Sequence, residues 1–395
     1  AFNNLTIDNA SGVSLGANVD LTGTLTLTNG VLTTTGKIFT LISSNSGTAR
    51  IGNIPGAGNI TGNIVMQRFI PAVPDWRILS PSVAGTTMAD WNGEISMSCI
   101  GGSPHTAPHF TSVYTYNETV GGTSGNGYSA NDDPGPVGVS LTDALTTGTG
   151  YMMWAGTCLP PCAPTTITTD LTGTLVKGTQ TISCSYTASA GDADDGWNMI
   201  GNPFPSDFSW DAAASTGGVT GIAYVYDPAS SGYLELNRSL PSDRDVIPSQ
   251  QGFWAKASGT AGAVVIEEAD KAADGMNFLK VGNNPPGLTL TLDGNGLTDI
   301  TEFYFLAGAN ETYDAPIDAL KLNSLNYLAH NFSSVSADSI DLAQNFLPEP
   351  IQNHSIPLRI NWTWPGIAGS YTISANDFTL PLSACVFLED TATGT

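Results

Sequence analysis

The chain has 395 residues and a formal net charge of −23, because 35 Asp and Glu face only 12 Lys and Arg. A surface of this sign repels phosphate backbones and anionic lipids, so we expect no nucleic-acid partner and no anionic membrane partner. No apolar run approaches the ~20 residues that a membrane-spanning helix needs, so we also expect no membrane insertion.

The composition predicts an all-β protein of more than one domain. The chain contains 44 Gly and 24 Pro, and charged residues make up only 12% of it. Thr, Ser and Asn take the polar positions that Lys and Glu fill in most soluble domains. β-branched residues suit pleated strands, and Gly, Pro and Asn suit tight turns. Three parts follow from the pattern along the chain, with bounds at 1–66, 67–272 and 273–395.

Residues 1–66 predict a short strand-repeat segment that resembles a β-solenoid. In ANVDLTGTLTLTNG, Val19, Leu21, Leu25 and Leu27 alternate with polar residues, which places them on one face. Asn29-Gly30 then supplies a turn. A hairpin series and a few solenoid coils both fit this pattern. Because a solenoid needs about three units and a cap, the segment must pack against another part of the protein.

Residues 67–272 predict a duplicated β-sandwich region, jelly-roll-like, with copies at about 67–190 and 191–272. The landmarks Trp76, Tyr114 and Gly150-Tyr151 recur in the same order as Trp197, Tyr224 and Gly252-Phe253. Prolines follow each Trp-containing run and end a strand, because proline cannot donate to a ladder. We interpret the aromatic residues as core packing, with an exposed sugar-stacking platform as the alternative.

Residues 273–395 predict an antiparallel β-sandwich. LTLTLDGNGLTDITEFYFLAG at 288–308 has two alternating runs around a Gly/Asn turn, and 356–377 has another two. SACVFLEDTATGT at 383–395 would supply the last strand. Helix signals are nearly absent, and only FSWDAAAS at 208–215 could form one or two turns.

Several of these motifs resemble one family of bacterial surface proteins. GWNMIGNPFPSDFSW, YVYDP and GFWAKA are similar to the module that precedes the sorting domain of Bacteroidetes proteins exported by type IX secretion. ITEFYFLAGANETYDAPIDALKL, IPLRINW and VFLEDTATGT are similar to the same proteins. The resemblance implies an extracellular or cell-surface protein, and it implies further strands and a sorting domain after a motif like the one at 386–395. It says almost nothing about activity.

The cysteines and one acidic cluster are candidate sites. Disulfides outside the cell are the preferred interpretation of Cys158, Cys162, Cys99 and Cys184, although the five cysteines leave at least one thiol unpaired and a zinc knuckle is an alternative. DADDG at 192–196 is the best calcium candidate, through Asp192, Asp194 and Asp195, with a solvated turn as the alternative. No other cofactor is expected.

Glycosylation is a further expectation. Asn-x-Ser/Thr sequences occur at Asn117 and Asn310, among others. The phylum of the resembling proteins also attaches sugars at Asp-Ser/Thr-aliphatic sites, which match Ser339 and Thr391.

These observations favour a non-enzymatic extracellular structural protein, the subunit of a surface fibre built by strand sharing between protomers. The opening strands have too little chain to bury their apolar face alone, and the last strand, ACVFLEDT, ends the chain where the sandwich of the resembling family continues. We therefore expect free strand edges, which invite strands of another copy. The alternative is a cell-surface adhesin or carbohydrate-binding module. A hydrolase is not expected, because no nucleophile elbow, HExxH or phosphate loop occurs in the sequence.

Overall fold

The computed structural model confirms the all-β prediction, with 50% of its described residues in strands and 3% in helices. Contacts divide the chain into two compact units, Ala1–Val281 and Gly282–Thr395. The described part of the chain contains one α-helix, α1 (Met88–Asn92), and two 3₁₀ turns, η1 (Ser124–Gly127) and η2 (Glu268–Asp270). The described residues are 1–72, 75–105, 110–121, 124–128, 139–155, 165–189, 194–240, 245–272, 284–326, 328–349, 354–362, 369–381 and 385–390.

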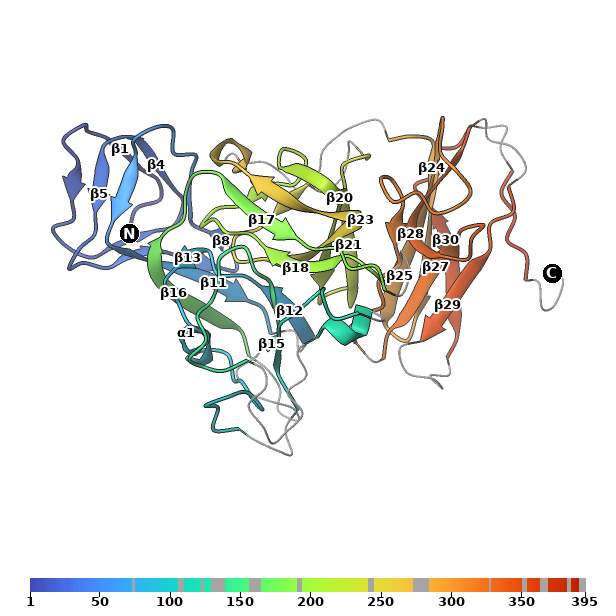
Figure 1. Ribbon diagram of the computed structural model, residues 1–395, viewed down its shortest axis with the longest axis horizontal. Coiled ribbons are helices and arrows are strands. Elements are labelled where there is room, and N and C mark those ends of the chain that lie inside the picture. Colours follow the sequence, from blue (N-terminus) through green and yellow to red (C-terminus); the bar gives the residue numbers. More distant parts are fainter. Residues whose placement is uncertain are drawn as a thin grey trace. The chain divides into compact units, whose positions relative to one another are not determined.

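The N-terminal segment is a three-coil parallel β-helix (Figure 1, blue). Its three faces are the parallel stacks β1-β4-β9, β2-β5-β10 and β3-β6-β11. The strands are β1 (Leu5–Asp8), β2 (Val13–Ser14), β3 (Val19–Leu21), β4 (Thr24–Asn29), β5 (Val31–Thr33), β6 (Phe39–Leu41), β9 (Arg50–Ile51), β10 (Asn59–Thr61) and β11 (Asn63–Ile70). A small hairpin, β7 (Ser43–Ser44) and β8 (Gly47–Thr48), lies between the second and third coils.

Equivalent apolar residues stack from coil to coil inside the β-helix. Leu5 pairs with Leu25, which pairs with Ile51, so one column runs through all three coils. Gly30 turns the corner between β4 and β5 with a φ of +85°. A Cβ there would lie 1.8 Å from the Asn9 carbonyl oxygen, so only glycine fits this corner. The alternation in the sequence therefore builds coils rather than hairpins.

The third coil continues into the next part of the chain. β11 pairs antiparallel with β16 (Ile167–Leu175) along its whole length, and β16 also pairs with β13 (Val83–Ala84). The boundary expected after residue 66 thus falls inside β11. One hydrophobic core runs from Ile7 in the first coil to Leu171 in β16. The β-helix is supported by this shared core and forms one unit with the region that follows.

The two copies of the duplicated region contain the same strand arrangement. In the first copy, β15 (Tyr151–Ala155) lies between β12 (Asp75–Leu79) and β14 (Val113–Tyr114). In the second, β23 (Gly252–Ile266) lies between β18 (Trp197–Gly201) and β20 (Ala214–Asp227). The second copy is extended by β17 (Gln180–Cys184), β19 (Phe208–Ser209), β21 (Gly232–Asn237) and β22 (Val246–Ile247).

The register of the two copies agrees residue by residue. Leu79, three residues after Trp76, pairs with Tyr151, and Ile200, three residues after Trp197, pairs with Phe253. Tyr114 pairs with the residue after Tyr151, as Tyr224 does with the residue after Phe253. The three sequence landmarks therefore occupy equivalent positions.

The two copies meet through reciprocal contacts. Leu79 bridges Gln251, and the equivalent Ile200 bridges Thr149. The Ser80 amide donates to the Gln250 carbonyl at 3.1 Å, and the equivalent Gly201 amide donates to the Gly148 carbonyl at 3.0 Å. Such reciprocity is the mark of a two-fold relation, here between two halves of one chain.

The second unit contains one seven-stranded sheet, in the order β29-β27-β28-β25-β24-β30, with β26 paired to β28. The β24–β25 hairpin turns at Asn295 and Gly296, both with positive φ, as its sequence predicts. The strands are β24 (Gly287–Gly294), β25 (Leu297–Leu306), β26 (Ala319–Leu320), β27 (His330–Val335), β28 (Asp341–Pro348), β29 (Leu358–Trp362) and β30 (Tyr371–Asn376).

The structure corrects three details of the expected architecture and shows in addition how β29 and β30 pair. β25 and β28 are parallel, joined by the long connection that parallel pairing requires, so the sheet is mixed. β29 and β30 pair with β27 and β24 and not with each other. Residues 208–215 form strand and turn instead of a helix, because β19 pairs with β22. Residues 385–390, expected in the last strand, lie outside the strands of the described residues.

Candidate functional site

The aromatic residues of the duplicated region pack mainly against one another. Trp76 contacts Tyr114 at 5.6 Å between ring centroids, and the equivalent Trp197 contacts Tyr224 at 5.1 Å. In the second copy these rings are buried, as core packing predicts. In the first copy, Trp76, Phe110, Tyr114 and Trp154 form a half-buried cluster, in which Phe110 is 37% exposed. We call these four side chains the aromatic quartet.

The second tryptophan of each copy also has an equivalent role. Trp91 packs edge-on against Tyr151 at 5.8 Å, and Trp210 packs against Phe253 at 5.5 Å. All four side chains are buried. The repeated spacing of tryptophans in the sequence therefore encodes a repeated aromatic core.

The acidic cluster proposed for calcium is only partly described. Asp192 lies outside the described residues. Asp195 is 5% exposed, and its carboxylate accepts hydrogen bonds from the Ser189 amide at 3.1 Å and the Ser189 hydroxyl at 3.0 Å. The ammonium of buried Lys256 donates to the Asp195 carbonyl. Within the described ranges, Asp194, Asp195 and their neighbours form no group of three potential metal ligands, so calcium here stays a prediction.

The predicted disulfides are also only partly described. Cys158 and Cys162 lie outside the described residues. Cys184 is a free thiol, packed in the core of the second copy at 1% exposure, so the structure does not place it in a bridge with Cys99. Burial raises the pKa of the Cys184 thiol to about 11. Cys385, in contrast, is exposed.

Three of the four glycosylation candidates lie on the surface. Ser339 is exposed at the β27–β28 turn, with a φ of +71°. Asn117 and Asn310 are exposed as well, although the Asn117 side chain accepts hydrogen bonds from the amide and hydroxyl of Thr119. Thr391 lies outside the described residues. Glycosylation requires a surface position, which these three residues have, and the attachment of sugars stays a prediction.

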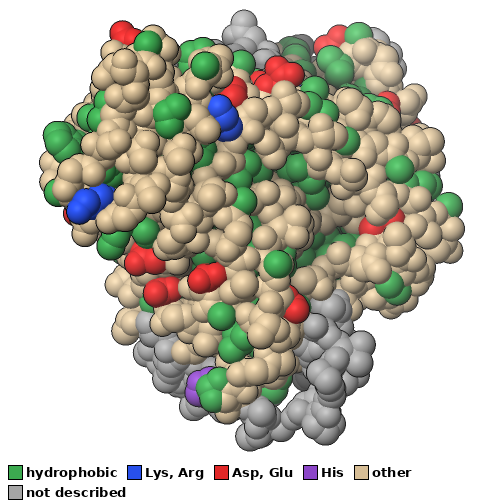
Figure 2. Space-filling model, turned by 60° about the vertical axis from the view of Figure 1, so that its left-hand side comes forward, with side chains coloured by type: hydrophobic (Ala, Val, Ile, Leu, Met, Phe, Trp, Pro, Cys, Tyr) green, Lys and Arg blue, Asp and Glu red, His purple; other side chains and the backbone are tan. Residues whose placement is uncertain are grey.

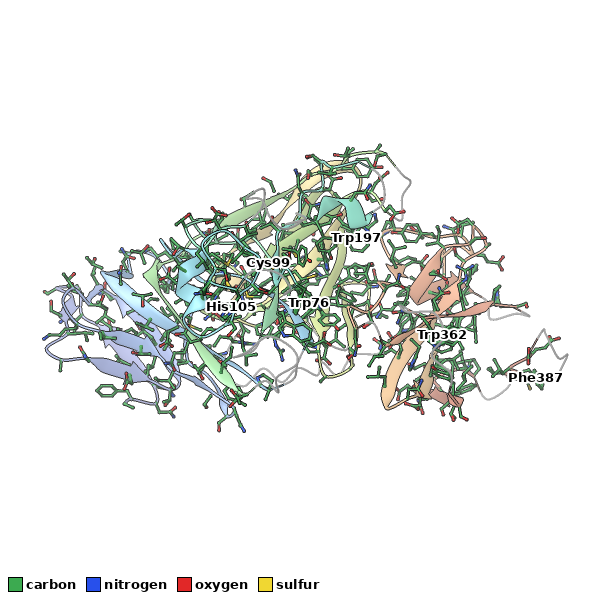
Figure 3. All side chains as sticks on the ribbon, turned by 90° about the horizontal axis from the view of Figure 1, so that it is seen from below. Trp76, Cys99, His105, Trp197, Trp362 and Phe387 are labelled. Carbon is green, nitrogen blue, oxygen red and sulfur yellow. The ribbon has the colours of Figure 1, made fainter. Side chains whose placement is uncertain are left out.

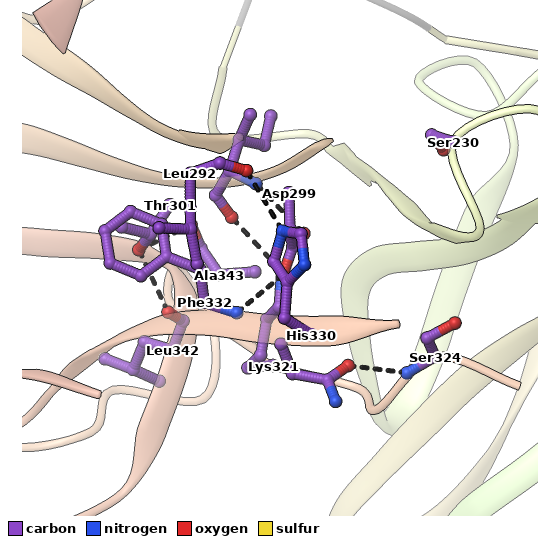
Figure 4. A network of polar contacts seen from close by, with 12 residues as sticks. Ser230, Leu292, Asp299, Thr301, Lys321, Ser324, His330, Phe332, Leu342 and Ala343 are labelled. Carbon is purple, nitrogen blue, oxygen red and sulfur yellow. Dashed lines mark hydrogen bonds and ion pairs between the residues drawn. The ribbon is translucent and has the colours of Figure 1, made fainter. Parts of the chain in front are cut away.

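A buried polar network holds the second unit together (Figure 4). The Asp299 carboxylate accepts from Lys321 Nζ and from the Phe332 amide, both at 2.6 Å. Thr301 Oγ1 donates to the Leu342 carbonyl and accepts from the Ser334 amide. These bonds connect β25 to β27 and β28. The polar groups that form them hydrogen-bond to one another, so we assign the network a structural role.

His330 belongs to the same network. Its Nε2 lies 3.0 Å from the Leu292 carbonyl, which can only accept, so Nε2 carries a proton. The ring packs edge-on against Tyr371, whose hydroxyl accepts a hydrogen bond from Trp362 Nε1. This chain of contacts brings the ends of the two outer strands, β29 and β30, together.

Asp318 is the most perturbed carboxyl of the second unit. Burial raises its pKa to about 7, against the effect of hydrogen bonds from the Phe346 and Asp314 amides. The side chain is 1% exposed, so it has no access to a substrate. We assign it a role in stability.

One open depression of about 380 Å³ lies beside α1 and β16 in the first unit. Burial, followed by the nearby Asp170, raises the pKa of Glu94 in its wall. The lining residues are Asn92, Gly93, Glu94, Ser96, Ile167 and Thr168. Besides the Glu94 carboxyl, these residues offer the hydroxyls of Ser96 and Thr168, and no histidine is among them.

Among the described residues, the most exposed large apolar side chain lies in the segment after β30. Phe387 is 87% exposed, and its neighbours Val386 and Leu388 are 48% and 59% exposed (Figure 3). We call residues 385–390 the apolar segment. Among the described strands, β30 pairs only with β24, and β29 pairs only with β27. An exposed apolar segment and two outer strands therefore occur in the same unit.

Comparisons with known proteins give a family without a known activity. No curated protein and no solved structure matches the chain. The described part of the chain contains no helix with the length and hydrophobicity to span a bilayer. The family described as "Domain of unknown function (DUF8693)" matches residues 1–236, which cover the β-helix, the first copy and part of the second. The chain belongs to this family of domains of unknown function, DUF8693.

Proposed function

We propose that the protein is a non-enzymatic extracellular structural protein, the subunit of a surface fibre assembled by strand sharing between protomers. The observation that carries this proposal is the apolar segment, in which Val386, Phe387 and Leu388 are 48%, 87% and 59% exposed. Burying apolar surface contributes about 25 cal/mol per Å², so three such side chains favour association strongly.

A strand is the form in which this segment can bind. Val386 and Phe387 have high β propensity, and the free N–H and C=O groups of an outer strand pair readily with another chain. Because donor and acceptor are different surfaces, each copy can give one strand and receive one. Head-to-tail contacts of this kind build an open filament unless the rotation closes a ring.

The extracellular location rests on the family resemblance of the sequence motifs. The type IX secretion modules of Bacteroidetes surface proteins resemble long stretches of this chain. Exposed Ser339 at a hairpin turn is a suitable acceptor for a glycan of such a protein. Surface sugars and a strongly acidic surface would keep assembled fibres soluble.

Sedimentation velocity of the full chain tests the proposal. We expect a concentration-dependent series of large species for the wild type and a monomer for the triple variant Val386→Asp, Phe387→Asp, Leu388→Asp. The control is Leu328→Asp, which places a charge at another apolar side chain, 50% exposed, in the same unit and should leave assembly intact. A wild-type chain that stays monomeric at high micromolar concentration would overturn the proposal.

The aromatic quartet supports a second candidate function, carbohydrate binding. Half-buried Trp76 and Trp154 are cross-strand partners, and Phe110 is 37% exposed beside them. The rings meet nearly at right angles, which suits packing better than a flat stacking platform. A glycan array, with Trp154→Ala as the control for specific signals, tests this candidate; the absence of any glycan signal would remove it.

A further inference from the structure

The two outer strands of the second unit differ in how well they resist pairing. β29 contains Arg359, whose guanidinium bonds Asp341 at 2.8 Å, and Pro357 precedes it. Charged residues and prolines are the usual protection of outer strands. β30 reads YTISAN and contains neither a charge nor a proline along its six residues. β30 is therefore the unprotected edge of the sheet.

From this difference we infer that β30 is the acceptor, and that it pairs with the apolar segment of a second copy of the chain. This inference rests on the proposed function and specifies its partner surface. Residues 385–390, taken as a strand, are long enough to pair with all six residues of β30. The occupant is thus a named segment of another copy.

The side of the sheet next to β30 is only partly covered. Phe303, Phe305 and Leu347 are buried there, but Leu290 and Leu380 at the margin are only partly buried. Leu290 pairs with Ala375 of β30, so only β30 separates this margin from the acceptor edge. An added strand would extend the sheet across it and cover these leucines.

The pattern of the apolar segment fixes which of its sides faces this margin. Alternate residues of a strand point to opposite faces. Val386 and Leu388 share one side, whereas Cys385, Phe387 and Glu389 share the other. We place Val386 and Leu388 toward Leu290 and Ile373, because their side of the strand carries two apolar side chains, whereas the other side carries Phe387 together with Cys385 and Glu389.

The path of the chain before the segment favours pairing between copies. Thr379 exchanges hydrogen bonds with Gly287, so the chain continues along β24 beyond the end of β30. Leu380 then packs against the core. The apolar segment follows with Phe387 87% exposed, and among the described residues it forms no ladder with β30. A second copy can therefore reach this edge.

Cross-linking of the full chain tests the acceptor. Cys385 is an exposed native thiol in the donor segment. Two variants place an additional thiol at exposed positions of β30, Thr372→Cys and Asn376→Cys. The matched control, Asn361→Cys, places it at an exposed position of β29. Equal amounts of ¹⁴N- and ¹⁵N-labelled protein are mixed, oxidised mildly and digested, and disulfide-linked peptides are identified by mass spectrometry.

The expected result is mixed-isotope linkage of Cys385 to a β30 position and none to β29. The inference would be overturned if Cys385 were linked to the β29 position alone. It would also be overturned if every linked pair of peptides carried a single isotope, because the disulfide would then lie within one copy. A second pair of variants reports on assembly directly: Thr372→Asp should abolish it by repelling acidic Glu389, and Asn361→Asp should not. If both variants assemble as the wild type does, β30 is not the acceptor, and only this inference is contradicted. If the wild type itself is monomeric, the proposed function is contradicted.

Discussion

At Gly252 the two halves of the duplicated region approach more closely than any other residue type would allow. A Cβ at this position would lie 2.3 Å from Ile78 Cγ2 and 3.1 Å from the Ile78 carbonyl carbon. Its equivalent, Gly150, faces the Ile200 carbonyl oxygen at 2.8 Å in the same way. The glycine before each aromatic landmark is thus required by the contact between the copies.

Gly252→Ala should lower the free energy of unfolding by about 1–3 kcal/mol, because the added methyl forces the two strands apart. Chemical denaturation followed by tryptophan fluorescence measures the change. Gly16→Ala is the control, since a Cβ there meets no atom within 4 Å. Equal stability of the two variants would contradict the close approach.

Two thiols should differ sharply in reactivity. Cys184 is buried, and burial raises its pKa to about 11, whereas Cys385 is exposed. At mildly alkaline pH, iodoacetamide should modify Cys385 in the native protein and Cys184 only after denaturation. Peptide mass spectrometry separates the two sites. Native modification of Cys184 at the rate of Cys385 would show that its core is open.

Asp318 should make the stability of the second unit depend on pH. Its pKa is about 7 in the folded state, above the ordinary value of 3.8. Between these two values the folded protein holds a proton that the unfolded chain has lost, so the free energy of unfolding falls as the pH rises from about 4 through 7.

Asp318→Asn removes this ionisation, so the slope should become shallower by up to about 1.4 kcal/mol per pH unit. Urea unfolding across this pH range measures both slopes, and Asp377→Asn, at an exposed position directly after β30, should keep the wild-type slope. An unchanged slope in the Asp318 variant would show that this carboxyl does not bind the proton.

Among the elements, the β-helix follows most directly from the sequence. The alternation around Val19, Leu21, Leu25 and Leu27 places these side chains inward, and Gly30 turns a coil corner. A period of two shows which side chains share a face of a strand, but it does not show which strands pair with each other. The sequence pattern therefore could not distinguish hairpins from coils. The support from β16 comes from more than a hundred residues further along the chain, so local patterns could not reveal it.

Leu25→Ala tests the stacked interior of the β-helix. Leu25 is fully buried in the middle coil, so its truncation should cost about 2–5 kcal/mol. Leu5→Ala is a matched control in the same column, because Leu5 lies in the outer coil and is only partly buried. Thermal unfolding should show the larger loss for Leu25; equal losses would argue against a covered middle coil.

The duplication was visible in the sequence, but its geometry was not. Trp76, Tyr114 and Tyr151 could be matched to Trp197, Tyr224 and Phe253 because the same core requires the same residue types. The two-fold relation depends on reciprocal backbone contacts, which carry no residue signature. In the second unit, the lack of charge in β30 could have indicated an open edge, but the order of strands could not be read from the sequence.

For the molecule as a whole, the acidic balance opposes contact between copies. The net charge is −23, and two of the 12 basic residues, Lys256 and Lys271, are buried. The face in Figure 2 shows scattered acidic side chains with few Lys or Arg. Association must therefore come from apolar burial and strand pairing against electrostatic repulsion.

Salt should consequently promote assembly. Screening shortens the range of repulsion to about 8 Å at physiological ionic strength, so the sedimentation coefficient should increase with NaCl concentration. The triple Asp variant of residues 386–388 should stay monomeric at every salt concentration. Dissociation of wild-type assemblies by salt would indicate that ion pairs hold them together.

Negative-stain electron microscopy of the purified full chain tests the central claim most directly. The account predicts filaments in which each copy contributes its apolar segment to the next, and single particles when residues 386–388 are changed to Asp. Single particles of one chain for the wild type, under conditions where the protein is folded and concentrated, would contradict it.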